Sequence, residues 1–165
     1  MPEQTRTVIV DTTPIIALSL IGQLELLQRL YIEVVIPPAV QGEVLAGGPG
    51  SPGVAELQRA NWIRVVSLPD PRRADLLSDL ERGEAEVVAL AQDLNAGLVI
   101  IDERLARRHA KRLGLPLTGT LGVLLKAKEL GLVPAVGPLI NRLRQGGIRL
   151  DDALVAETLG LAGEG

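Results

Sequence analysis

An apolar run that ends in a carboxylate constrains this chain more than any other feature. Residues 8–10 read Val-Ile-Val, a β-branched run that favours a buried strand, and Asp11 follows them directly. Aspartate is poor strand material, so the strand is expected to end there. Thr13 is predicted to cap a helix that starts at Pro14, because proline has no amide hydrogen to lose at that position. Asp11 would then lie at the carboxyl edge of a sheet, where open α/β sheets bind ligands.

The same arrangement returns later in the chain. Residues 98–101 read Leu-Val-Ile-Ile, an unbroken apolar run typical of a parallel strand that is covered on both faces, and Asp102 follows it. A helix with an aliphatic face over residues 84–91 leads into this strand. Since parallel strands end on the same side of a sheet, Asp11 and Asp102 would project into one crevice if their strands are neighbours.

Strand and helix patterns alternate along the first 118 residues, which predicts an α/β fold with a parallel sheet and helices on both sides. The length of 165 residues fits one domain, residues 1–165, with C-terminal helices from about 120 to 162. The other expected strands are 34–36, 63–66 and 115–118, and the expected helices are 15–30 with a break at Gly22, 38–45, 54–60, 105–113, 119–131, 136–145 and 151–161.

Composition excludes several kinds of chemistry. The chain has no cysteine, which rules out disulfides, thiolate metal sites and cysteine nucleophiles. Only Tyr31 and Trp62 are aromatic, so stacking of bases on aromatic side chains is a weak prospect. The first six residues lack an export signal and no apolar run approaches the ~18 residues of a membrane span, so we expect a cytoplasmic protein without membrane contact. A net charge of −3 argues against a generally basic nucleic-acid binder but leaves room for a local basic patch.

Two further acids can reach the same edge of the sheet. Glu43 lies in the helix after the second strand, and Glu84 lies at the start of the helix that feeds the fourth. Four carboxylates close together would raise one another's pKa unless a cation lies among them, and oxygen ligands of this kind suit Mg²⁺ or Mn²⁺. Such a site hydrolyses phosphodiesters without histidine or cysteine. The alternatives remain that Asp11 is a turn residue and that Glu84, or Glu86, is a first-turn acid favoured by the helix dipole.

A basic helix begins two residues after Asp102. A run of basic residues on a helix usually forms only a solvent-exposed face. From this position, however, the side chains could contact phosphates, and such contacts do not depend on base sequence. His109 among them is interpreted as a solvated neighbour, and the glycine-rich segment 47–53 as a plain loop, because it lacks the strand and the Gly-Lys-Ser/Thr of a phosphate-binding loop. The cations are Arg104, Arg107, Arg108, Lys111 and Arg112.

These stretches together resemble the PIN domain, a family of small metal-dependent nucleases. The resemblance runs from about Val8 to Leu125, and the ending Leu-Thr-Gly-Thr at 117–120 resembles an uncharacterised prokaryotic branch of the family. It implies a three-layer α/β/α sandwich with a parallel sheet of four to five strands, an acidic quartet that binds Mg²⁺ or Mn²⁺, and cleavage of single-stranded RNA. The motifs that carry it are residues 8–14, 36–43, 83–86 and 98–104.

Carried over by position, the resemblance implies that Asp11, Glu43, Glu84 and Asp102 are the metal-binding and catalytic acids. Many relatives are homodimeric toxins held inactive by a cognate antitoxin protein. The chain departs from the family pattern at three places. Glu84 stands where Asp is common, with Glu86 as a competing candidate, Ile100 stands where a Ser or Thr often orients the site, and Glu103 adds an acid beside Asp102.

The leading hypothesis is therefore an Mg²⁺- or Mn²⁺-dependent ribonuclease of the toxin type, in which Thr12 or Thr13 hydrogen-bonds a site carboxylate or a phosphate. The alternative is a catalytically weak PIN-like module that binds nucleic acid or regulates. A third class, phosphoryl transfer through an aspartyl nucleophile, would also place Asp11 after the first strand. The dehalogenase-type pattern needs a second Asp two residues later, where this chain has Thr13.

Overall fold

The computed structural model describes residues 6–165, and its centre is one sheet of five parallel strands in the order β3-β2-β1-β4-β5. The central strand β1 (Thr7–Val10) pairs with β2 (Glu33–Ile36) on one side and with β4 (Leu98–Ile100) on the other. The edge strands are β3 (Ile63–Val65) and the two-residue β5 (Leu117–Thr118). The two strands that precede Asp11 and Asp102 are therefore direct neighbours, as the shared crevice requires.

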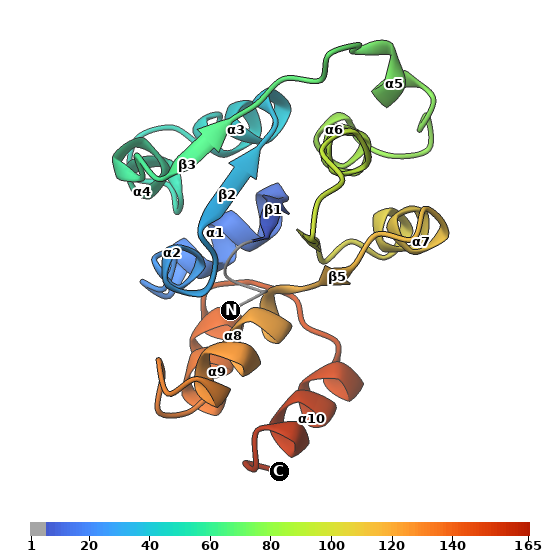
Figure 1. The fold of residues 1–165 in the computed structure, drawn as a ribbon. Coiled ribbons are helices and arrows are strands. Elements are labelled where there is room, and N and C mark those ends of the chain that lie inside the picture. The colour runs from blue at the N-terminus through green and yellow to red at the C-terminus, as the bar shows by residue number, and fades with distance from the viewer. Residues whose placement is uncertain (1–5) are drawn as a thin grey trace.

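Helices cover both faces of the sheet, which gives the predicted three-layer α/β/α architecture (Figure 1). Helices α1 and α2 lie on one side together with α8, and α6 and α7 lie against each other on the opposite side. The helices are α1 (Thr12–Leu20), α2 (Leu26–Leu30), α3 (Pro38–Leu45), α4 (Val54–Arg59), α5 (Arg72–Asp75), α6 (Arg82–Asp93), α7 (Arg104–Arg112), α8 (Thr120–Glu129), α9 (Gly137–Gln145) and α10 (Asp152–Leu161).

The first helix starts earlier than the sequence predicts. Helix α1 begins at Thr12 with Asp11 at the capping position, so the prediction that Thr13 caps a helix starting at Pro14 is wrong. The backbone amide of Asp11 still donates to the Ile100 carbonyl at 2.9 Å, which continues the strand ladder up to Asp11, and the chain turns directly into the helix. Pro14 then falls within the first turn, where amides have no partner inside the helix and a missing one costs little.

The core is aliphatic, as the composition requires. The three central strands are buried except for the first residues of β1 and β2, Thr7 and Glu33, and the helices pack leucine, valine, isoleucine and alanine side chains onto them. Burial on both faces explains why the strands read as continuous apolar runs without alternation. Across residues 6–165 no helix is long and apolar enough to cross a bilayer. The expectation about an export signal concerns mainly residues 1–5, which lie outside the described part of the chain.

One carboxylate, that of Glu164, links the C-terminal segment to α8 and α9. Glu164 accepts hydrogen bonds from the backbone amides of Val136 and Gly137, both at 2.8 Å, where α9 begins. It also pairs with the Lys128 ammonium of α8 at 2.8 Å. The lysine bond, followed by the two amide bonds, lowers the pKa of Glu164 to about 2. We refer to this arrangement as the Glu164 anchor.

Candidate functional site

Asp11 is the acid around which the candidate site is built. It ends the central strand, its side chain lies beneath the surface at 4% exposure, and its Oδ1 atom has no hydrogen-bond partner among the described residues. The pKa of Asp11 is raised to about 7, mainly by burial and also by the charges of Glu84, Glu43 and Asp102, although a hydrogen bond from the Thr12 amide acts to lower it. A buried carboxylate oxygen without a donor is costly unless something else binds it.

Glu43 reaches the site from α3. The Thr12 hydroxyl donates to Glu43 Oε2 at 2.7 Å, so the first residue of α1 holds an acid 31 positions away. The carboxylate also lies against Gly83 at the start of α6, where a Cβ atom would stand only 2.2 Å from Glu43 Oε1. Because glycine has no side chain, α1, α3 and α6 can all meet at this carboxylate. The predicted role of Thr12 as a partner of a site carboxylate matches this contact.

Glu84 and Glu86 have different surroundings. Glu84 accepts a hydrogen bond from the Glu81 amide at 3.2 Å, and its pKa is raised by burial and then by the charges of Glu103, Glu81 and Glu43. Glu86 instead accepts from the Ala39 amide at 3.2 Å and pairs with Arg82 at 2.8 Å. Glu86 therefore joins α3 to α6, whereas Glu84 belongs to the electrostatic cluster around Asp11.

Asp102 follows β4 and is exposed, but its carboxylate is fixed. The backbone amide of Thr120 donates to Oδ1 at 2.8 Å and the Thr120 hydroxyl donates to Oδ2 at 2.6 Å. Sequence reasoning missed Thr120 as a site residue. The only signal was its place in the Leu-Thr-Gly-Thr stretch at 117–120, whose function a local pattern does not reveal.

A groove of about 620 Å³ opens beside Asp102 and is lined by residues of α7, α8 and α10. Thr13 and Asp102 line it at the end near the site, and we call it the basic groove after its cations. Arg107 is partly committed to the protein, because its guanidinium donates to the Ile101 carbonyl at 2.7 Å. The cations that line it are Arg104, Arg107, Arg108, Lys111 and Arg149. Four of the five cations that the sequence predicts near phosphates are thus among them, and Arg112 is not.

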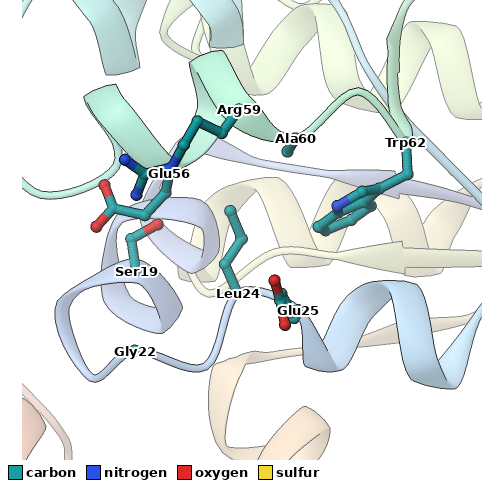
Figure 2. A pocket seen from close by; sticks show the side chains of 8 residues that line it. All are labelled: Ser19, Gly22, Leu24, Glu25, Glu56, Arg59, Ala60 and Trp62. Atoms are coloured by element: carbon teal, nitrogen blue, oxygen red, sulfur yellow. The ribbon is translucent and has the colours of Figure 1, made fainter.

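Two other features lie apart from this cluster. His109, which the sequence predicts to be a solvated neighbour, pairs with Asp79 at 3.0 Å, and its side chain is 17% exposed. A smaller cavity of about 280 Å³ lies between the end of α1 and the loop after α4, with Trp62 at one end and Ser19 at the other (Figure 2). Helix α1 runs away from the carboxyl edge and Trp62 precedes β3, so this cavity lies at the amino edge of the sheet.

The donor chemistry at the carboxyl edge fits a divalent ion, since the available ligands are carboxylate oxygens and one of them is buried without a partner. The side chains are not gathered around a single point. Within residues 6–165 no three acids or histidines lie close enough to hold a metal ion. Glu43, Glu84 and Asp102 each accept a hydrogen bond from the protein.

Comparison with known proteins agrees with the geometry. A family model described as a PIN domain (DUF3368) matches residues 7–164. Among solved structures, the chain is similar to a PilT N-terminus domain protein, SSO1118, from the hyperthermophilic archaeon Sulfolobus solfataricus P2. The TM-score is 0.53 at 19% sequence identity, over 73% of this chain and 92% of that one, a likeness that concerns the fold alone. No curated protein matches the chain.

Proposed function

The chain belongs to the PIN-domain family, and on that premise we propose that it is a divalent-metal-dependent endoribonuclease that cleaves single-stranded RNA. PIN domains are in general nucleases that use divalent metals. The observation that carries the proposal is the environment of the Asp11 carboxyl group. Its carboxyl is buried at the carboxyl edge of the sheet, one oxygen has no donor, and three other acids act on its pKa.

The residues that would hold Mg²⁺ or Mn²⁺ are the four acids Asp11, Glu43, Glu84 and Asp102. When bound, the ion would supply a more acidic water as nucleophile and neutralise charge on the attacking and leaving oxygens. Thr12 holds Glu43 at the site. Thr13 lines the basic groove together with Asp102, which supports a hydrogen bond from its hydroxyl to a phosphate of the substrate.

The basic groove supports a role in substrate binding. Arg104 and Arg108 are exposed on α7, where they can neutralise phosphates of a strand that leads to Asp102. Binding of this kind is insensitive to sequence and sensitive to salt. Replacing Arg108 with alanine should weaken binding of different single-stranded RNAs about equally and reduce the salt slope by about 1. Filter binding at several salt concentrations measures both quantities.

The family resemblance supports a wider proposal, that the protein is a homodimeric cytoplasmic toxin neutralised by a cognate antitoxin. Induced expression should then arrest growth, and Asp11→Asn should abolish the arrest. Sedimentation of the purified protein tests the dimer separately.

The direct test is an RNA cleavage assay. Pure wild-type protein with Mn²⁺ should cut single-stranded RNA, and EDTA should stop the reaction. Asp11→Asn should lower the rate at least about 100-fold, because even residues that only support metal ligands cost 10–100-fold. Asp152→Asn is the matched control, since it removes one negative charge at a side chain that is 97% exposed on α10. Cleavage that survives both Asp11→Asn and EDTA would count against the proposal.

One observation favours a second candidate, a PIN-like module that binds or regulates without efficient catalysis. It is the separation of the acids, none of which lies with two others at metal-binding distance within the described chain. Such a module would bind single-stranded RNA with the salt dependence given above, but Mn²⁺ would not produce cleavage.

A further inference from the structure

We propose that Thr120 is a positioning residue of the candidate metal site, which fixes the carboxylate of Asp102 in the orientation that binds the ion. This inference rests on the proposed function, because it assumes that Asp102 is a metal ligand. Nothing in the family match or in the sequence pattern assigns a role to Thr120. The inference comes from the contacts that this residue makes.

Thr120 engages both oxygens of one carboxylate. Its amide donates to Oδ1 at 2.8 Å and its hydroxyl donates to Oδ2 at 2.6 Å, so the Asp102 carboxylate is held at two points and cannot rotate freely. Each carboxylate oxygen has about two acceptor positions, and one donor leaves the other available. The contact therefore orients Asp102 without using up its capacity to bind an ion.

The donors themselves are rigid. Thr120 is 2% exposed and begins α8, and the next residue, Leu121, is buried in the core. Gly119 precedes it with extended backbone, and a Cβ at that position would lie 2.5 Å from Asp102 Oδ1. The start of α8 is thus built closely around this carboxylate. Outer donors of this kind orient ligating carboxylates in metal sites.

A purely structural alternative explains the same contact. An acid at a helix N-terminus stabilises the helix, so Asp102 could serve only to cap α8. The two roles differ in what they predict. Capping affects the stability of the fold, whereas positioning also affects the affinity for metal.

The experiment measures Mn²⁺ affinity by electron paramagnetic resonance of the free ion. Thr120→Val removes the hydroxyl donor with little change in shape, and the expected loss of Mn²⁺ affinity is about 10- to 100-fold, while Thr120→Ser should restore affinity close to wild type. Thr7→Val is the matched control. It deletes an equivalent threonine-to-carboxylate bond, to Glu33 at 2.7 Å, at the opposite end of β1.

The outcomes separate the two proposals. If wild type binds Mn²⁺ and Thr120→Val binds it equally well, the positioning role is overturned and the proposed function stands. If wild type neither binds Mn²⁺ nor cleaves RNA, the proposed function fails first. A crystal structure of metal-free Thr120→Val adds a readout that does not depend on metal. The Asp102 carboxylate should leave its wild-type orientation there, and an unchanged carboxylate would also overturn the inference.

Discussion

Two carboxylates in different parts of the molecule have opposite electrostatic surroundings. Glu164 accepts from two backbone amides and a lysine, and these donors lower its pKa to about 2. Asp11 is buried with one oxygen unpartnered, beside other acids, and its pKa is raised to about 7. The first arrangement stabilises the protein by itself. The second destabilises it unless a proton or a cation is supplied, which is the arrangement expected of a ligand site.

The largest predicted effect follows from replacing Asp11, the carboxylate whose charge destabilises the folded protein. A pKa of about 7 in the folded state, against 3.8 when unfolded, means that stability falls as pH rises from about 4 to about 7. Above pH 7 the loss is on the order of 4 kcal/mol, since one pKa unit corresponds to about 1.4 kcal/mol. Without divalent ions, Asp11→Asn should therefore raise Tm strongly at pH 8 and hardly at pH 4.

Thermal unfolding across this pH range measures the effect. Asp152→Asn serves again as the control and should track the wild type. If Asp11→Asn and wild type melt at the same temperature at pH 8 in EDTA, then the charged Asp11 carboxylate does not destabilise the fold as its surroundings indicate.

The second prediction uses a cation in place of the mutation. Mn²⁺ at 100 times its dissociation constant should stabilise the wild type by about 2.7 kcal/mol at pH 8. The gain should be much smaller in Asp11→Asn and in Asp102→Asn, because each has lost a ligand. An equal rise in Tm in all three proteins would mean that the ion binds elsewhere.

The third prediction concerns a substitution at Gly83, which should displace the Glu43 carboxylate without replacing any of the acids. In Gly83→Ala the new Cβ would meet the end of the Glu43 side chain, which is flexible enough to move away. The fold should survive, while Mn²⁺-dependent cleavage falls about 10- to 100-fold as Glu43 is displaced. Gly42→Ala is the matched control, since a Cβ there meets nothing within 4 Å. It should leave cleavage unchanged and add about 0.5–1 kcal/mol of helix stability.

The smallest predicted effect concerns Glu164, the carboxylate whose contacts stabilise the folded protein. The lowered pKa of Glu164 contributes stability above about pH 4.5 that is lost as pH falls toward 2. Glu164→Gln should lower Tm modestly at pH 7, and the difference from wild type should vanish near pH 2. Glu129→Gln, at an exposed position of α8, should show no such pH-dependent difference. RNA cleavage should be unchanged in both variants.

Sequence reasoning found the strand-end acids because their positions follow from local pattern. A buried parallel strand reads as an apolar run, and the aspartate after it must lie at the carboxyl edge, so the sequence predicted that Asp11 and Asp102 share this edge if their strands are neighbours. The pairing of β1 with β4 meets that condition. The early start of α1 was missed because the strand ladder extends to the Asp11 amide through a bond to Ile100. That bond depends on the neighbouring strand, and no local sequence pattern near residue 11 indicates it.

The supporting residues could not be predicted for a similar reason. Thr120 matters through a carboxylate 18 positions earlier, and Gly83 through one 40 positions earlier. Likewise, Glu84 and Glu86 look alike in sequence, and only the contacts of Glu86 with Ala39 and Arg82 distinguish them. Local periodicity predicts which face of an element is buried, but not which distant side chain approaches it.

The central place of β1 also governs when the acidic edge can exist during synthesis. One side of this strand pairs with residues 33–35, which leave the ribosome soon afterwards, but its other side pairs with residues 98–100. Until that segment emerges, the Val-Ile-Val run has an open, apolar border that can pair with other chains. Asp102 and Thr120 are translated later still, so a nascent or truncated chain that ends before them lacks one of the four proposed acids and the residue proposed to orient it.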